Sequence, residues 1–209
     1  MSTNTVPQVD PKHYRFSKYC GGERWKNYWY QADTIFKSGA RTVLEIGPGD
    51  QTVTNLLRKN GISVTTVDID PQLKPDTVAS VEKLPFPDGS FDAVLCSEVL
   101  EHIPYESFSQ ALKEIHRVSK NHVTIGLPHA GVVFLFRVKV PLLSYVTLFF
   151  KIPFFWKTHQ FNGEHYWELG KNGYSRKNVR GMMESIGFNV VEETIHYDDP
   201  AHCLFVLRK

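Results

Sequence analysis

The sequence has few cysteines and little excess of either charge. Three of its 209 residues are cysteines, Cys20, Cys96 and Cys203, and they lie far apart. This odd number excludes a closed disulfide framework, and no pair has the spacing of metal ligands. The formal net charge is only +2, so total charge does not indicate a nucleic-acid partner. These absences favour free thiols in a reducing compartment, and we predict a cytoplasmic location.

The patterns of a secretory signal and of an uninterrupted membrane span are not expected in this sequence. The first ten residues are polar and have no apolar core, which is not the pattern of a secretory signal. We expect residues 1–21 to be an N-terminal lead-in that begins disordered. The apolar segment 130–156 has the length of a membrane helix. Arg137 and Lys139 lie inside it, and charges at that depth are costly, so we do not interpret it as a span.

The length and composition are those of one globular domain. Hydrophobic residues make up 42% and charged residues 22% of the chain, which is ordinary for a packed protein and unlike a disordered one. We therefore predict a single domain over residues 1–209, with an insertion at 128–174.

Helical and strand patterns alternate along the chain. The predicted helices lie around 25–36, 53–57, 108–118 and 179–186, and the predicted strands lie at 42–46, 63–67, 91–96, 122–127, 189–195 and 203–207. Such alternation predicts a Rossmann-like, doubly wound α/β fold with a mostly parallel sheet. The turn Asp198-Asp199-Pro200 joins the last two strands into an antiparallel hairpin. Ligands of such sheets bind at the carboxyl ends of the strands.

A glycine-containing turn follows the first predicted strand. It reads Glu45-Ile46-Gly47-Pro48-Gly49, and its glycines let the backbone approach a ligand next to helix N–H groups. A dinucleotide fingerprint would need a glycine at Thr52, so that pattern fails. Glu45 suits a ligand that carries an ammonium group. Asp68, at the end of the next strand, can accept hydrogen bonds from two ribose hydroxyls. Together these residues favour a nucleoside ligand.

Four motifs carry a resemblance to a known family. The first is the glycine turn, and the second is Val67-Asp68-Ile69-Asp70. The third is residues 82–92, EKLPFPDGSFD, and the fourth is residues 97–103, SEVLEHI. In this order and spacing they resemble the class I S-adenosylmethionine-dependent methyltransferases, specifically the small-molecule group called type 11. The resemblance is close over about residues 41–127.

The resemblance implies a seven-stranded sheet, S-adenosylmethionine as cofactor and a set of contacts to it. The implied cofactor-binding residues are Glu45, Gly47, Gly49, Asp68, Ile69, Val81, Glu82, Ser97 and Glu98. Glu45 is expected to bind the methionine amino group directly or through water, and Asp68 the ribose hydroxyls. Ile69 is expected to pack on the adenine. Ser97 and Glu98 are expected near the methyl-bearing end.

A catalytic base is needed only if the methyl acceptor must lose a proton, as a hydroxyl does. The candidates are His102, His129, His165 and Tyr166. His129, which follows the fifth predicted strand, is our first choice. His102 is the second, although packing or capping is the favoured role for it. His165 and Tyr166 either close over an acceptor or lie in an exposed loop. Their spacing is not that of a helical zinc site, and we predict no metal.

The apolar insertion lies where the family builds its acceptor site. Its large apolar residues are Phe134, Phe136, Leu142, Leu143, Tyr145, Phe149, Phe150, Phe154, Phe155 and Trp156. So much apolar surface needs a covering partner. We expect a helical lid over the acceptor pocket. The alternatives are an interfacial helix whose Arg137, Lys139 and Lys151 meet lipid head groups, or a homodimer interface.

The leading prediction is an enzyme that methylates a small molecule, with sugars and lipid-linked groups among the acceptors. One alternative is a non-catalytic scaffold that binds S-adenosylmethionine, because Gln51 and Ser80 replace a glycine and an acid of the family. Another is a methyltransferase that acts on a lipid at the membrane surface. No base-flipping motif follows the fourth strand, and we predict no nucleic-acid partner.

Overall fold

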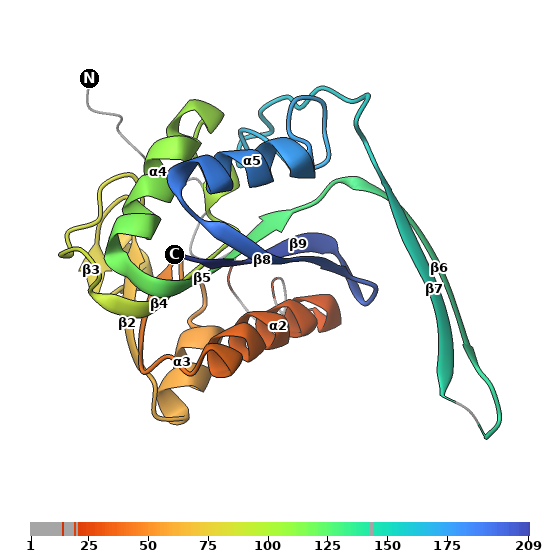
Figure 1. The fold of residues 1–209 in the computed structure, drawn as a ribbon, viewed down its shortest axis with the longest axis horizontal. Helices are drawn as coiled ribbons and strands as arrows, with labels where there is room; N and C mark the ends of the chain where they lie inside the picture. The colour runs from red at the N-terminus through yellow and green to blue at the C-terminus, as the bar shows by residue number, and fades with distance from the viewer. Residues whose placement is uncertain (1–13, 15–18, 20, 143) are drawn as a thin grey trace.

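The computed structural model describes Tyr14, Tyr19 and residues 21–142 and 144–209. The expected disorder of the first residues, Cys20 and Leu143 therefore fall outside the described residues. A seven-stranded sheet with the order β3-β2-β1-β4-β5-β9-β8 forms the centre (Figure 1). Its parallel strands are β1 (Thr42–Ile46), β2 (Ser63–Asp68), β3 (Thr77–Val78), β4 (Phe91–Ser97) and β5 (Ser119–Pro128).

Two antiparallel strands complete one edge of this sheet. β9 (Asp199–Arg208) pairs with β5, and β8 (Asn189–His196) pairs with β9. The predicted mostly parallel sheet with a C-terminal antiparallel hairpin is therefore confirmed. The short β3 at the other edge was not predicted, because two residues carry no periodic signal.

Helices cover both faces of the sheet, as Figure 1 shows. They are α2 (Gly22–Ser38), α3 (Thr52–Lys59), α4 (Tyr105–Val118) and α5 (Arg176–Ile186). Successive residues of a strand point to opposite faces. Val43 of β1 accordingly packs in a cluster with α2 and α3, whereas Leu44 packs in a cluster with α4 and α5. Burial on both faces explains why the parallel strands are continuous apolar runs.

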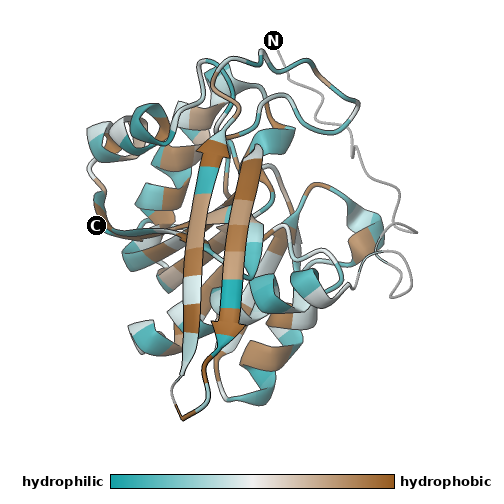
Figure 2. Cartoon of the chain, turned by 90° about the vertical axis from the view of Figure 1, so that its right-hand side faces the viewer, coloured by the Kyte–Doolittle hydropathy of each residue, from teal (hydrophilic) through white to brown (hydrophobic). Residues whose placement is uncertain are grey.

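The apolar insertion is a β-hairpin, so the prediction of a helical lid is wrong. β6 (Gly131–Lys139) and β7 (Tyr145–Pro153) pair in register from Gly131↔Pro153 to Lys139↔Tyr145. The segment is rich in valine and aromatic residues, which favour strands, and Pro141 falls in its turn. Figure 1 shows the hairpin projecting from the rest of the fold, and Figure 2 shows apolar residues along both of its strands.

Lys151 fixes the base of this hairpin to the sheet. Its Nζ donates hydrogen bonds to the backbone oxygens of His129 and Pro200, at the ends of β5 and β9. Burial lowers the pKa of Lys151 to about 8, which is the effect expected when an amine is removed from water. Among the described residues, no helix is long and apolar enough to cross a membrane.

Candidate active site at the carboxyl edge of the sheet

The turn after β1 can accommodate only glycine at position 47. Gly47 has φ +68°, and a Cβ built there would lie 2.3 Å from Cγ2 of Val99. Its N–H donates a hydrogen bond of 2.9 Å to the backbone oxygen of Val67 in β2. The turn is thus packed between the ends of β2 and β4, and it leaves bare backbone at the edge where ligands of such sheets bind.

Gln51 adopts the left-handed conformation that a glycine would adopt easily. Its φ is +59°, and its Nε2 donates a hydrogen bond of 2.9 Å to the backbone oxygen of Leu73. For a residue with a Cβ this conformation costs roughly 1–2 kcal/mol. The backbone at Gln51 therefore keeps the left-handed conformation that the family's glycine would adopt easily at this position.

Glu45 lies at the end of β1, beneath the turn, and is almost completely buried. Oγ1 of Thr54 donates a hydrogen bond of 2.5 Å to its Oε2. Burial raises the pKa of Glu45 to about 7, although this hydrogen bond opposes the shift. A cationic group that binds beside this buried carboxyl group would stabilise its ionised form, which is a strong hydrogen-bond acceptor.

Asp68 lies at the end of β2, next to the turn. Its Oδ1 accepts a hydrogen bond of 2.8 Å from the N–H of Asp70, and burial raises its pKa. Ile69 is partly buried beside it, and Val81 is buried in the core. The Ser80 hydroxyl accepts a hydrogen bond of 3.2 Å from the N–H of Glu82. Asp68, Ile69, Val81 and Glu82 were predicted from the motifs.

Two tyrosines that the motifs did not indicate lie at the same edge. A Cβ on Gly49 would be 3.1 Å from Cε1 of Tyr14. Burial raises the pKa of Tyr14, and the charge of Asp68 raises it further. Tyr14 and Tyr19 are in edge contact, with ring centroids 4.9 Å apart, and the Arg24 guanidinium lies 4.3 Å from the Tyr19 centroid. The sequence before α2 has no periodic pattern that predicts these contacts.

Ser97 and Glu98 lie at the carboxyl end of β4, where the fourth motif begins. Glu98 has φ +55°, and its N–H donates a hydrogen bond of 3.0 Å to the backbone oxygen of Gly126. The Ser97 hydroxyl and Oε1 of Glu98 are buried and have no hydrogen-bond partner among the described residues. Within the described residues, these two atoms are therefore available as hydrogen-bonding groups for a ligand.

His202 of β9 was not predicted, yet it contacts Glu98. Its Nε2 lies 3.5 Å from Oε2 of Glu98, and its Nδ1 lies 2.6 Å from Oδ1 of Asp199. Asn27 of α2 donates a hydrogen bond of 2.9 Å to the other Asp199 oxygen. Burial lowers the pKa of His202, but Glu98 and Asp199 raise it more, so the net shift is upward. A carboxylate-held imidazole is an arrangement suited to proton transfer.

His129, our first choice as a base, is buried at the base of the hairpin. Neither ring nitrogen has a hydrogen-bond partner among the described residues. Burial, together with the charges of Lys151 and Arg176, lowers the pKa of His129 to about 3. Such an imidazole holds a proton weakly at neutral pH. The structure therefore gives no support to a proton-accepting role for His129.

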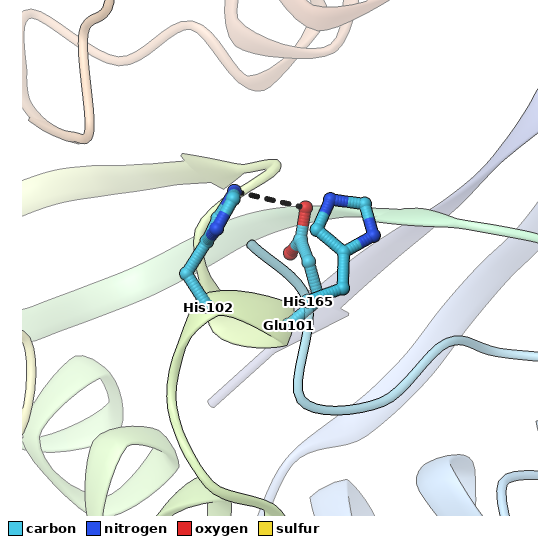
Figure 3. Close-up of side chains that lie close together, drawn as sticks. All are labelled: Glu101, His102 and His165. Atoms are coloured by element: carbon cyan, nitrogen blue, oxygen red, sulfur yellow. Dashed lines mark ion pairs between the residues drawn. The ribbon is translucent and has the colours of Figure 1, made fainter. Parts of the chain in front are cut away.

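His102 lies on the short 3-10 helix η3 (Leu100–His102), and the segment after the hairpin reaches it. The N–H of Tyr166 donates a hydrogen bond of 2.8 Å to the backbone oxygen of Glu101. The rings of His102 and His165 are in edge contact, with centroids 5.0 Å apart. Figure 3 shows Glu101 between the two histidines. Two of the predicted base candidates are thus brought together around a carboxyl group.

Residues 44–125 match the family model described as a methyltransferase domain. Among curated proteins, the ubiquinone biosynthesis O-methyltransferase of Xanthomonas campestris is 36% identical over 90 residues, which cover 36% of this chain and 37% of that protein. An uncharacterised methyltransferase of Mycobacterium bovis is 30% identical over 105 residues, which cover 46% and 42%. The chain thus spans less than half the length of these curated relatives.

Solved structures share the fold over nearly the whole chain. The N-methyltransferase NodS from Bradyrhizobium japonicum, in complex with S-adenosyl-L-homocysteine, has a TM-score of 0.63 at 11% identity and covers 97% of this chain and 94% of its own. The 1,6-didemethyltoxoflavin-N1-methyltransferase of Burkholderia thailandensis has a TM-score of 0.55 at 15% identity, with 98% and 92% covered. The domain match covers the residues of all four motifs and so confirms the resemblance to methyltransferases there, and the solved structures show that the fold is shared.

Proposed function

We propose that this chain, which carries a methyltransferase domain over residues 44–125, transfers the methyl group of S-adenosylmethionine to a small-molecule acceptor. The observation that carries the proposal is the carboxyl edge of β1 and β2. There a turn that accommodates only glycine at position 47 lies beside a buried Glu45 and the carboxylate of Asp68. A backbone-contacting chain fits the glycine turn, an ammonium group fits Glu45, and a ribose diol fits Asp68.

The same edge supports the contacts that we propose for the cofactor. Gly47 and Gly49 present backbone to the methionine part, Ile69, Val81 and Glu82 line the adenine, and Ser97 and Glu98 face the methyl-bearing end. When bound, the cofactor supplies a methyl group already activated by positive sulfur. The chain therefore has mainly to hold the acceptor in line with that methyl group and to exclude water.

For an acceptor that must lose a proton, we propose His202 as the group that takes it. It contacts Glu98 at the end of β4, and Asp199 fixes its ring. Nε2 of His202 would accept the hydroxyl proton, and the bound cofactor would supply the methyl group that the acceptor oxygen takes up. His102 is the predicted alternative at the same edge. Residues 128–174 are proposed to border the acceptor.

The test of the proposed function is a calorimetric titration with S-adenosylmethionine and S-adenosylhomocysteine, followed by transfer of labelled methyl groups to pooled small-molecule acceptors. Binding with transfer is the expected result. Binding without any transfer would favour the scaffold alternative, and absence of binding would contradict the proposal.

The affinity for S-adenosylhomocysteine is expected to depend on pH through Glu45. Its pKa of about 7 in the free protein means that the carboxyl group is largely neutral at pH 6 and largely ionised at pH 7.5. Only the ionised form attracts an ammonium group, so the affinity should be roughly five- to tenfold weaker at pH 6 than at pH 7.5. Calorimetry at both pH values measures the ratio.

The matched variant for this prediction is Glu45→Gln, which keeps an acceptor for the Thr54 hydroxyl but cannot ionise. Its affinity should be lower than that of the wild type at pH 7.5 and should change little between the two pH values. The same pH ratio in the variant as in the wild type would show that Glu45 is not the titrating group.

A second candidate function, methyl transfer to a lipid at a membrane surface, is favoured by the hairpin. Its exposed large apolar residues include Phe134, Leu135, Phe136, Leu142, Tyr145, Leu148 and Phe150. No acidic residue occurs from position 131 to position 163, whereas Arg137 and Lys139 lie in the hairpin. Lys151, which was expected to meet lipid head groups with them, instead donates hydrogen bonds to backbone oxygens at the base of the hairpin. Arg137 and Lys139 both lie against the Tyr145 ring, near the turn. Apolar residues flanked by cations suit an anionic bilayer.

The protein is therefore expected to sediment with vesicles of phosphatidylserine and phosphatidylcholine more strongly than with phosphatidylcholine alone. The double variant Phe136→Ser/Leu142→Ser should bind at least tenfold more weakly, since each apolar side chain contributes about 1.5–3 kcal/mol when buried. Leu56→Ser/Val191→Ser, which alters exposed apolar residues away from the hairpin, is the control. Equal binding by both double variants contradicts the prediction. A concentration-dependent dimer that the hairpin variant loses would instead identify a second copy as the partner.

A further inference from the structure

Three potential metal ligands meet where η3 contacts the segment after the hairpin. They are Glu101, His102 and His165, and one oxygen or nitrogen atom from each lies within 4.8 Å of the others. Figure 3 shows the two imidazoles on either side of the carboxyl group. The spacing in the sequence does not reveal this group, because the hairpin separates His165 from the other two residues.

The carboxyl group of Glu101 is the first sign that something binds here. It is completely buried, and neither of its oxygens has a hydrogen-bond partner among the described residues. Burial raises the pKa of Glu101 well above its ordinary value, and the charge of Glu98 raises it further. Buried carboxyl groups are normally hydrogen-bonded, paired or bound to a metal. Among the described residues, the carboxyl group has no hydrogen bond, and its pairing with Nε2 of His102 is loose, at 3.8 Å, which favours a cation that both groups bind.

The second sign is the way in which the two imidazoles are held. Nδ1 of His102 lies 3.0 Å from the backbone oxygen of Glu164, and Nδ1 of His165 lies 3.2 Å from Oε1 of Glu168. Both partners accept hydrogen bonds, so each Nδ1 carries a proton, and Nε2 is the nitrogen through which each ring would bind an ion. Metal-binding histidines are oriented in this way by a carbonyl or a carboxylate.

The outer carboxylate is itself fixed. Nζ of Lys171 lies 2.8 Å from Oε2 of Glu168. The hydrogen bond from His165 lowers the pKa of Glu168 to about 2, and Lys171 contributes to the shift. Glu168 therefore holds His165 with one oxygen while Lys171 holds the other. His102 Nε2 lies 3.8 Å from Oε1 of Glu101, so small side-chain rotations would bring both atoms onto one ion.

We propose that Glu101, His102 and His165 bind a divalent metal ion. Two imidazoles and one carboxylate suit Zn²⁺, Mn²⁺ or Fe²⁺ better than Ca²⁺, which prefers oxygen ligands. Three protein ligands leave a position open, as in catalytic rather than structural sites. This proposal replaces the sequence-based prediction of no metal.

The position of the site points to the class of acceptor. Glu101 is close enough to Glu98 for the two charges to interact, and Glu98 contacts His202. An open coordination position beside these groups suits an acceptor that carries a hydroxyl or phenol oxygen, because a divalent cation lowers the pKa of such a group. This assignment to an oxygen acceptor rests on the proposed function, whereas metal binding does not.

The experiment titrates chelator-treated protein with ZnCl₂ and, separately, with MnCl₂, using calorimetry for both and electron paramagnetic resonance for Mn²⁺. The wild type should bind one ion per chain. His165→Ala and Glu101→Gln should each weaken binding at least 100-fold. His116→Ala is the matched control, because His116 lies in the last turn of α4, about 15 Å along that helix from its start near η3, and it should bind like the wild type.

Each variant is also titrated with S-adenosylhomocysteine, and its fold is checked by circular dichroism. His165 is partly exposed, so its replacement by alanine should leave the fold intact even if Glu101→Gln does not. Wild-type protein that binds S-adenosylhomocysteine but neither metal would overturn the metal site. The same holds if folded His165→Ala binds metal like the wild type. Metal binding without S-adenosylhomocysteine binding would instead overturn the proposed function and leave the metal site standing.

Discussion

Replacing Asp68 by alanine is expected to weaken S-adenosylhomocysteine binding by at least 100-fold. The carboxylate lies at the end of β2, beside the glycine turn, where two ribose hydroxyls can donate to it. A hydrogen bond to a charged group contributes about 1.5–3 kcal/mol, so two of them correspond to at least a 100-fold change in the dissociation constant. Calorimetry of the wild type and the variant measures the change.

Two further variants separate this effect from a structural one. Asp68→Asn keeps an oxygen for the N–H of Asp70, which now donates to Asp68 at 2.8 Å, and it should lose less affinity than Asp68→Ala. Asp76 accepts hydrogen bonds from Thr66 and pairs with Arg58 at 2.6 Å, so Asp76→Ala should lower stability and leave affinity almost unchanged. Equal loss of affinity in all three variants would mean that Asp68 acts only through the local fold.

Gly47→Ala is the second change with a large expected effect. A Cβ at this position would lie 2.3 Å from Cγ2 of Val99, and the φ of +68° is itself unfavourable for alanine. The conformational cost is roughly 1–2 kcal/mol, and the displaced valine adds about 1–3 kcal/mol. We expect a decrease of about 3 kcal/mol in the free energy of unfolding, measured by urea denaturation, and loss of S-adenosylhomocysteine binding.

Gly181→Ala is the control for Gly47→Ala. Nothing lies within 4 Å of a Cβ at position 181, inside α5, and no positive φ occurs there. This substitution should raise stability by about 0.5–1 kcal/mol, because alanine favours helices. In the double variant Gly47→Ala/Val99→Ala the clash is removed but the conformational strain stays. Stability should therefore recover only in part, and a single Gly47→Ala protein as stable as the wild type would refute the steric argument.

The sequence was most informative where a structural feature depends on neighbouring residues. Serine favours the N-cap of a helix, and the Ser175 side chain accepts a hydrogen bond from the N–H of Asn178 at the start of α5. Glycine favours the position that ends a helix, and Gly187 ends the same helix with φ +112°. The hairpin β6–β7 was missed because a long apolar run has no clear period, so helix and strand cannot be distinguished from it. Its valines and aromatic residues were the signal that favoured strands.

The residues of the candidate site were likewise predictable only in part. The motifs placed Gly47 and Asp68 at the sheet edge, since each directly follows a strand. His202 could not be predicted in this way, because its contact with Glu98 depends on the antiparallel pairing of β9 with β5. His165 was noticed in the sequence but not its position beside Glu101, because a hairpin of unknown shape lies between them. Contacts between distant segments require the tertiary fold, which local patterns do not contain.

The chain leaves the sheet after Ala130 and returns to it at Phe154, whose N–H donates back to the backbone oxygen of Ala130. The intervening hairpin is therefore an inserted loop whose two ends lie next to each other. The entropic cost of such a loop changes only slowly with its length. Insertions, deletions or substitutions in this hairpin should therefore leave the register of the strands around Asp68 and Glu45 unchanged. The projecting hairpin can therefore vary independently of the sheet edge that we propose as the binding site of the methyl donor.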